Sequence, residues 1–539
     1  MKRILLLWSV LFLFYSCSSK LDYSDKKIFK YNESAGITSL DPAFAKDQAN
    51  IWAVNQLFNG LVQFDSALNI KPCIAKSWLI SDSGKVYTFY LRKDVYFHKN
   101  ECFSNKDSTR KVVASDFVYS FNRLLNEKVA SPGVWVFNNV EKNGFKALND
   151  TTFQIVLKGS FPPFMGLLCM KYCSVVPKEA IENQENNFAR NPVGTGAFCF
   201  KMWKEGVKMV LLKNKNYFEY DGANRLPYLD AVNISFVIDK QTAFLEFIKG
   251  NLDFISGIDA SYKDELLTPQ GLLNPKYSNK VYLIKQAYLN TEYLGFLMDD
   301  SLDIVKSSPL KDKRIRQAIN FGFDRVKMMA YLRNNIGKAA VNGMIPRGMP
   351  SFDENKMYGY SYKPDKSRAL LEEAGYPGGV GLPEIKLSTT ASYLDICNYI
   401  QHELSQVGIK LIVDVTPPGS LREMIATSKM NFFRGSWIAD YADAENYLSL
   451  FCTNNFCPKG PNYTHFSSKE FDKLYELSFS EVNDSLRYTY YQKMDSIIMS
   501  EAAVVPLYYD EVLRFIRKNI KGLGSNPMNL LDLKKVMKD

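Results

Sequence analysis

The stretch Ile385 to Val415, IKLSTTASYLDICNYIQHELSQVGIKLIVDV, decides the fold class. Ile385 to Ser388 has the composition of a short strand, and Tyr393 to Val407 has the apolar spacing of a helix that Gly408 ends. Ile409 to Val415 then reads as a second strand with one apolar face. A strand, a helix and a strand in this order form a βαβ unit. The chain is therefore predicted to be an α/β protein.

The same mixture of short strands and helices continues on both sides of this unit, without internal repeats. Downstream, a long amphipathic helix is predicted near Lys469 to Ser500, followed by a strand over Val504 to Tyr509. Upstream, the predicted elements are a helix over Asn50 to Phe58, strands over Val86 to Arg92 and Val95 to His98, a helix over Ser115 to Leu125 and a helix over Asp365 to Ala374.

The first residues have the three parts of a bacterial export signal. Lys2 and Arg3 precede a run from Ile4 to Tyr15 that contains no charged residue, and the chain turns polar after Cys17. That run is shorter than the roughly 20 residues that a membrane-spanning helix needs. A small residue before Cys17 resembles a lipoprotein cleavage box, so 1–16 is predicted to be a lipoprotein signal peptide and Cys17 the lipid attachment site. A plain secretory signal cut nearby is the alternative.

The bulk composition is that of a globular protein. Hydrophobic residues make up 46% of the chain and charged residues 23%, which argues against disorder. The net charge is +10, and it falls to +8 once Lys2 and Arg3 are removed with the signal peptide. Basic residues stand among acidic ones rather than in a stripe, so no nucleic-acid partner is expected.

Nine cysteines occur, and eight remain when Cys17 is set aside. Cys452 and Cys457 flank a turn-like stretch and are predicted to form a disulfide, because an exported chain meets oxidising conditions. Cys169 and Cys173 fit one helix face as buried thiols. Neither pair has a second pair of ligands at the spacing of a zinc site, so no metal and no cofactor is expected.

Motifs of enzymes are missing from the sequence. It contains no G-x-S-x-G, H-E-x-x-H, Walker or G-x-G-x-x-G pattern, and its three histidines are His98, His402 and His465. The chain is therefore not expected to be an enzyme. A surface hydrolase or glycan-binding lipoprotein remains the alternative, because two catalytic carboxylates need not be close in sequence.

The chain resembles a known family through motifs spread over its whole mature length. Each motif alone is weak, but their order and spacing together are specific. They are SLDPAF at Ser39 to Phe44, LFNGLV at Leu57 to Val62, IAKSW at Ile74 to Trp78, YTFYLRKDVYFH at Tyr87 to His98, ASDFVYSFNRLL at Ala114 to Leu125, NPVGTGAF at Asn191 to Phe198, RIRQAINFGFDR at Arg314 to Arg325, SWIADYADAENYL at Ser436 to Leu448 and VVPLYY at Val504 to Tyr509. The family is that of the oligopeptide- and dipeptide-binding proteins of ABC importers, the family 5 extracellular solute-binding proteins.

This resemblance implies a periplasmic-binding-protein clamshell, in which two lobes joined by hinge strands close on an extended peptide and a third domain is added. By similarity, lobe I comprises 20–64, 190–287 and 506–539, the extra domain II 65–189, and lobe II 288–505. Several chain crossings between the lobes allow bending while they resist twisting.

The resemblance also implies where a peptide binds. Asp440 matches the aspartate that holds the α-ammonium of the peptide, and Trp437 and Arg434 match residues that line a side-chain pocket and reach toward a ligand carboxylate. Alternative roles are a helix cap for Asp440, core burial for Trp437 and an exposed strand position for Arg434. Asn50, Ile51 and Trp52 resemble the lobe I segment that pairs with the peptide backbone. A role at the start of a helix is equally open for these three residues.

The implied function is capture of peptides and their delivery to a membrane permease. The expected partners are a peptide and the permease subunits of an ABC transporter, and the protein is expected to be a monomer. It is expected in the periplasm, anchored to a bacterial membrane by the lipid on Cys17. The same fold also carries non-peptide solutes, so a different ligand is the alternative within this class.

Overall fold

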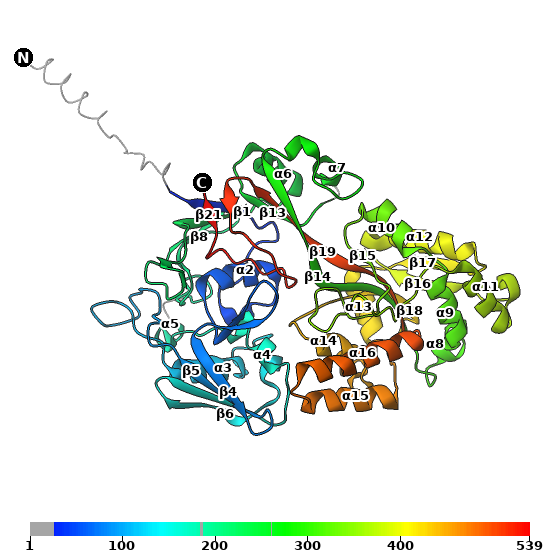
Figure 1. Cartoon of the computed structure of the whole chain (residues 1–539), viewed down its shortest axis with the longest axis horizontal. Coiled ribbons are helices and arrows are strands. Elements are labelled where there is room, and N and C mark those ends of the chain that lie inside the picture. Colours follow the sequence, from blue (N-terminus) through cyan, green and yellow to red (C-terminus); the bar gives the residue numbers. More distant parts are fainter. Residues whose placement is uncertain (1–25, 184–186, 260) are drawn as a thin grey trace, which may run out of the picture.

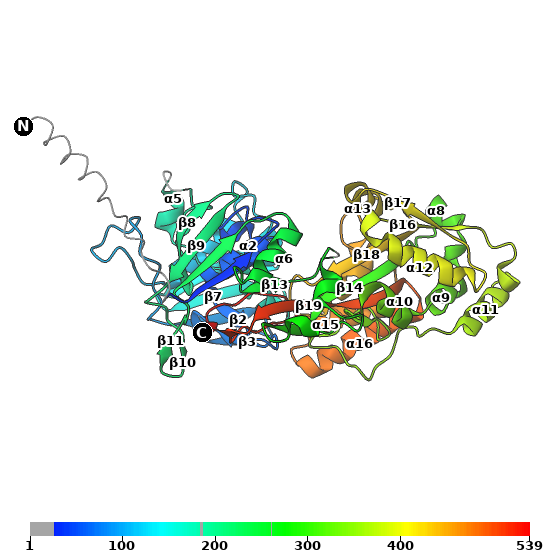
Figure 2. The same cartoon turned by 90° about the horizontal axis from the view of Figure 1, so that it is seen from above.

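The computed structural model describes residues 26–183, 187–259 and 261–539. The predicted signal peptide and Cys17 therefore lie outside the described residues. Two bodies stand side by side and are joined by long strands that run from one to the other (Figures 1 and 2). In the part of the chain that the structure describes, no helix is both long and apolar enough to cross a membrane.

One eleven-stranded sheet passes through both bodies. Its strands follow, in spatial order, as β17 (Leu411–Val415), β16 (Ile385–Thr389), β18 (Phe432–Ile438), β14 (Val281–Phe296), β19 (Val504–Arg517), β13 (Phe254–Ser256), β1 (Ile28–Asn32), β12 (Ala231–Ser235), β9 (Lys208–Lys213) and β8 (Phe198–Lys204), with β15 (Lys338–Ala339) beside β19.

The strands β14 and β19 connect the two lobes. They are antiparallel and paired from Val281 opposite Arg517 to Gly295 opposite Val504, with the register broken between Ala287 and Thr291. At that break the continuous ladder is interrupted, which makes it the place where the ribbon can bend. The structure thus has the clamshell arrangement that the sequence implies.

Lobe I contains the N-terminal half of the sheet and a C-terminal segment that returns to it. Phe29 and Tyr31 on β1 are buried and pack against Phe254 of β13 and Trp52 of a helix. Its helices are α2 (Gln48–Leu57), α6 (Lys240–Lys249) and α7 (Lys263–Leu266), and two short strands near the C-terminus pair as β20 (Ile520–Lys521) and β21 (Met537–Lys538).

The extra domain is built on a separate four-stranded antiparallel sheet. Alternate residues of β5 are buried, and Phe117 and Phe121 of the helix that covers the sheet pack against Phe153 on its neighbour. The sheet runs β4 (Ala75–Ser81), β5 (Val86–Leu91), β7 (Thr152–Leu157) and β6 (Val140–Asn149), and the helices are α3 (Ala114–Leu124), α4 (Phe164–Leu167) and α5 (Lys178–Glu182). A hairpin of β2 (Val62–Phe64) and β3 (Ile70–Pro72) leads into it, and β10 (Tyr220–Asp221) and β11 (Asn224–Arg225) form another.

Lobe II holds most of the helices and has a hydrophobic core of its own, distinct from the cluster that lobe I and the extra domain share. Its helices are α8 (Asp303–Lys306), α9 (Lys313–Phe321), α10 (Arg325–Arg333), α11 (Pro364–Glu373), α12 (Leu394–Ser405), α13 (Pro418–Ala426), α14 (Glu445–Leu448), α15 (Lys469–Ser480) and α16 (Asp484–Ser500).

The predicted βαβ unit is confirmed, because β16 and β17 are parallel and α12 connects them. Two other predicted elements differ from those in the structure. The expected helix from Lys469 to Ser500 is two helices, because Asn483 accepts a hydrogen bond from the Leu486 N–H and starts α16 afresh. The expected strand from Val95 to His98 is reduced to a single bridge between Tyr96 and Lys111.

The predicted disulfide between Cys452 and Cys457 is wrong for this structure, in which both residues are free, buried thiols. Each sulfur has other neighbours. Cys457 Sγ lies 3.2 Å from His465 Nε2, whereas Cys452 lies beside Asp472. The turn-like spacing of the two residues therefore places them in one loop without joining them.

Candidate functional site between the lobes

The carboxyl ends of the parallel strands in both lobes face the junction between them. In lobe II, β18 runs antiparallel to β14 and ends at Ile438 opposite Asn290, near the hinge. In lobe I, β13 runs antiparallel to β19 and ends at Ser256 opposite Arg514. In open α/β sheets, ligands bind outside the carboxyl ends of the strands. The topology therefore directs the site to the junction between the lobes.

Asp440 stands two residues beyond the end of β18, and Asn446 fixes its position. The Asp440 main-chain N–H donates to Asn446 Oδ1 at 3.2 Å, and Asn446 Nδ2 donates to Asp440 Oδ2 at 3.4 Å. Asn446 is buried, whereas Asp440 remains exposed to solvent. One carboxylate oxygen is thus oriented by the protein while the other is left for a ligand.

The surroundings of Asp440 suit a positively charged group. Desolvation by the surrounding protein raises the pKa of Asp440, and the hydrogen bond from Asn446 works in the opposite direction. Across the junction, burial together with the charges of Asp440 and Asp47 raises the pKa of Tyr172 to about 12. Two carboxylates therefore act on Tyr172 from the same region, which favours a positively charged ligand group there.

The strand that leads to Asp440 has an open edge. Ala439 donates its N–H to the Leu289 carbonyl beside β14, so by alternation the main-chain groups of Ser436 and Ile438 point to the other side. On that side β16 pairs with β18 only at Phe433, and no strand of the described chain pairs with Gly435 to Ile438. This edge can accept an extended chain as an additional strand.

Trp437 and Arg434, the other expected site residues of β18, both have partners within the protein. Trp437 is half-buried and donates its Nε1–H to Asn446 Oδ1 at 2.9 Å, so it supports the residue that positions Asp440. Arg434 is not an exposed strand residue. It pairs with the buried Glu292 and lies 3.3 Å from the centre of the Tyr393 ring. Its Nε has no hydrogen-bond partner in the described part of the chain.

Asn50, Ile51 and Trp52, which the resemblance places beside the peptide backbone, lie in helix α2, and their contact with a ligand stays a prediction. Asp47 caps this helix by accepting from the Asn50 N–H at 3.0 Å, and Ile51 donates to the Asp47 carbonyl at 2.9 Å. Trp52 is buried and donates its Nε1–H to the Asn529 carbonyl at 2.8 Å. Their main-chain donors are used within the protein, so the role at the start of a helix is the one observed.

Lobe I contributes a hollow of about 270 Å³ at the carboxyl ends of β1 and β13. Glu33, Ser34, Ser256, Gly257 and Asp259 are among its lining residues. Desolvation raises the pKa of Glu33, the Ala35 N–H lowers it, and the charge of Asp47 raises it further. The wall of lobe I is therefore polar and acidic.

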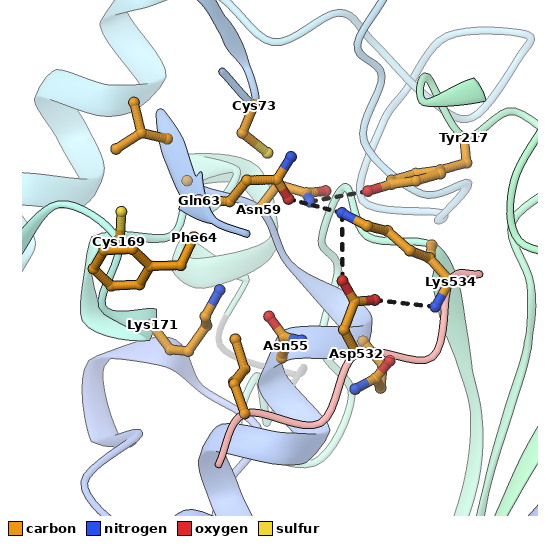
Figure 3. Close-up of a pocket in the computed structure, with 15 residues that line it drawn as sticks. Asn55, Asn59, Gln63, Phe64, Cys73, Cys169, Lys171, Tyr217, Asp532 and Lys534 are labelled. Atoms are coloured by element: carbon orange, nitrogen blue, oxygen red, sulfur yellow. Dashed lines mark hydrogen bonds and ion pairs between the residues drawn. The ribbon is translucent and has the colours of Figure 1, made fainter. Parts of the chain in front are cut away.

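Two other cavities differ from this site in size and place. A cavity of about 700 Å³ lies between the extra domain and lobe II, where Ala442 and Asp443 continue the Asp440 loop. A smaller one, shown in Figure 3, lies beside α2 and has a volume of about 30 Å³. There Lys534 contacts Gln63 and Asp532, and the space fits roughly one water molecule. This second cavity is too small for a peptide.

Sequence reasoning missed Asn446 as an organiser of the site and missed Asp47, Glu33 and Tyr172 on the opposite side. From the sequence, Asn446 was predictable only as a residue of a helix. Glu33 and Ser34 could have been found, because they follow the short strand Ile28–Asn32 at its carboxyl end, where ligands bind in α/β sheets.

The fold and the site define a two-lobed protein that binds a solute at the junction of its lobes. Residues 69–456 match the model of the bacterial extracellular solute-binding proteins, family 5 Middle, and the chain belongs to this family. This family consists of solute-binding proteins and not of enzymes.

Individual relatives cover nearly the whole chain. Heme-binding protein A of Haemophilus influenzae is 26% identical over 94% of this chain and 91% of its own length. The dipeptide-binding protein of Escherichia coli is 24% identical over 88% of this chain and 87% of its own. The solved structure of DppA from Helicobacter pylori in complex with the peptide STSA has a TM-score of 0.72 and 25% identity, with 95% of this chain and 98% of that one covered.

Proposed function

We propose that this protein captures peptides between its two lobes and delivers them to the permease of an ABC importer. The observation that carries the proposal is the position of Asp440, an oriented carboxylate at the end of a strand with an open edge. The strand edge suits the peptide backbone, and the carboxylate suits the α-ammonium. Every peptide with a free N-terminus has both groups, so such a site accepts varied sequences.

The relatives support the same ligand class without excluding another. The DppA structure contains a tetrapeptide, and the Escherichia coli relative is a dipeptide-binding protein, whereas the Haemophilus influenzae relative is a heme-binding protein. Among the described residues, no group of three or more His, Cys, Asp or Glu side chains has an arrangement that could hold a metal ion. Because one relative is a heme-binding protein, a non-peptide solute is the competing proposal. Identification of the bound ligand would decide between the two.

Replacing Asp440 tests the proposal. Asp440→Asn keeps the shape of the side chain and an oxygen for Asn446, so the ligand-free melting temperature should not change. Peptides with a free N-terminus should bind at least about tenfold more weakly, a loss of about 1.4 kcal/mol, because their ammonium loses its counter-charge. Isothermal calorimetry of wild type and variant, each with free and N-acetylated peptide, gives the four affinities of a double-mutant cycle.

The control is Asp365→Asn on α11, whose side chain is 97% exposed and, among the described residues, forms an ion pair only with Arg368 on the same helix. This variant should bind free peptide as wild type does. If Asp440→Asn also binds free peptide with unchanged affinity, Asp440 is not the ammonium site.

A further inference from the structure

Four polar side chains from separate segments meet at the end of lobe II that lies away from the hinge. Asp299 follows the end of β14, Ser428 follows α13, and Cys457 and His465 belong to the loop before α15. None of them belongs to the binding site described above. Cys457 is 5% exposed, and the side chains of His465 and Asp299 are 9% and 25% exposed.

The distances are those of a nucleophile, a base and a group that orients the base. Cys457 Sγ lies 3.2 Å from His465 Nε2, and His465 Nδ1 lies 3.0 Å from Asp299 Oδ2. Ser428 Oγ lies 3.3 Å from the sulfur and 3.2 Å from Nε2. The ring of Phe456 stacks on the imidazole at 4.4 Å with an angle of 3°, which fixes the ring plane. This pattern is the signature of an activated nucleophile.

Asp299 determines which nitrogen of His465 carries a proton. Hydrogen bonds from Ser301 lower the pKa of Asp299, and burial works against them, while His465 adds a further lowering contribution. An ionised carboxylate only accepts, so Nδ1 carries the hydrogen and Nε2 is left to accept the thiol proton. Once protonated, Nε2–H can also donate to the Cys457 carbonyl at 3.2 Å, and Ser428 can donate to the thiolate.

The other described cysteines lack such a base. Burial raises the pKa of Cys452 to about 11, with a further contribution from Asp472, and raises that of Cys102 to about 11. Burial also raises the pKa of Cys73 and Cys199 to about 12. Cys452 is the matched comparison, because it is 5% exposed, as Cys457 is, and lies in the same loop.

We propose that Cys457 is a peroxide-reactive thiol, activated by His465 and Asp299 and converted by hydrogen peroxide to a sulfenic acid. His465 Nε2 takes the thiol proton, and the thiolate attacks one oxygen of hydrogen peroxide. The S–O bond forms as the O–O bond breaks, and the leaving hydroxide takes the proton from His465 to become water. Cysteine is oxidised by two electrons and peroxide is reduced. Hydrogen peroxide, with only two heavy atoms, is small enough to reach a thiol that is only slightly exposed.

The experiment treats the purified full-length protein with one equivalent of hydrogen peroxide in the presence of dimedone, which traps sulfenic acids. Peptide mapping by mass spectrometry then measures the adduct on each cysteine. Cys457 should carry at least tenfold more adduct than Cys452. His465→Gln should slow labelling of Cys457 at least tenfold, and Asp299→Asn should slow it as well, while peptide affinity and melting temperature report intact folding.

Two results overturn the proposal. One is labelling of Cys457 that does not exceed that of Cys452. The other is unchanged Cys457 labelling in a folded His465→Gln or Asp299→Asn protein, which would make the four side chains a structural hydrogen-bond cluster. If His465→Gln fails to fold, the comparison of Cys457 with Cys452 in wild type and the Asp299→Asn variant still decide.

Discussion

At the scale of single residues, Asn446 gives Asp440 its character as a binding group. One buried amide accepts from the Asp440 N–H and the Trp437 indole and donates to the Asp440 carboxylate. A surface aspartate without these bonds would move freely and lose entropy on binding. The orientation is therefore set before the ligand arrives.

Glu445, the first residue of α14, is a buried carboxyl group whose protonation should affect stability. Burial raises its pKa from 4.5 to about 7, against the lowering effect of hydrogen bonds from Tyr441 and Tyr475. Tyr441 in turn packs against Trp135 of the extra domain, with ring centres 6.2 Å apart. Tyr441 thus joins Glu445 to a contact between lobe II and the extra domain.

The stability of the fold should depend on pH through Glu445. Between pH 4.5 and about 7 the folded chain holds a proton on Glu445 that the unfolded chain releases, so the free energy of unfolding falls as pH rises. The loss is complete above about pH 7 and reaches about 3 kcal/mol at most. Glu445→Gln removes this contribution, so its melting temperature should decline less than that of wild type from pH 5 to pH 8.

Thermal melts of both proteins across this range measure the difference. Asp495, whose pKa burial also raises to about 7, adds the same trend to both proteins and cancels in the comparison. Parallel pH curves for wild type and Glu445→Gln would show that Glu445 is already ionised in the folded state.

At the scale of elements, local patterns predicted those parts of the fold that local sequence determines. The run Ile385 to Val415 has its own periodicity and its own terminating glycine, so its βαβ unit was predictable. The length of β19 was not, since Asp510 and Glu511 interrupt its apolar pattern although the strand continues to Arg517. As a hinge strand, β19 runs from lobe II into lobe I, and its extended conformation is maintained by hydrogen bonds to β14 and not by a local apolar pattern.

The residues of the candidate site also differ in whether local sequence could predict them. Asp440 was proposed through its motif and the helix over Asn50 to Trp52 was predicted from the sequence, whereas the pairing of Arg434 with Glu292 joins positions far apart in sequence. Contacts of this kind leave no signal in one sequence without its fold.

The open edge of β18 makes a prediction about the ligand. If the peptide adds to this edge as a strand, methylation of a backbone N–H that pairs with β18 removes a hydrogen bond and adds a steric clash. One such methylation should weaken binding by at least about fivefold, roughly the value of one hydrogen bond. Methylation at the neighbouring position, which points away, should have little effect.

Calorimetry with a series of singly N-methylated tetrapeptides gives this pattern directly. An alternation of weak and normal binders along the peptide supports strand addition. Equal effects at all positions would argue against pairing with Gly435 to Ile438.

At the scale of the whole molecule, β14 and β19 connect two bodies whose carboxyl strand ends face one another. A bend where their register breaks would close the lobes on a ligand, and the extra domain shares a hydrophobic cluster with lobe I. The predicted boundaries at 287 and 505 fall within or beside these two strands. We retain those domain boundaries as a proposal.

The place of the protein in the cell depends on Cys17, which we propose as its lipid attachment site. Cys17→Ala prevents acylation, so the variant should move from the membrane fraction to the soluble fraction of an expressing cell. Fractionation and immunoblotting measure this shift. Continued membrane association of the variant would mean that another segment anchors the chain.

The central claim is that the ligand is a peptide, and the most direct measurement is native mass spectrometry of protein purified without refolding. We expect a series of bound masses that dissociate into peptides with free N-termini, and loss of most of this series in Asp440→Asn. A single bound mass that belongs to a heme, a metal complex or another non-peptide solute would contradict it.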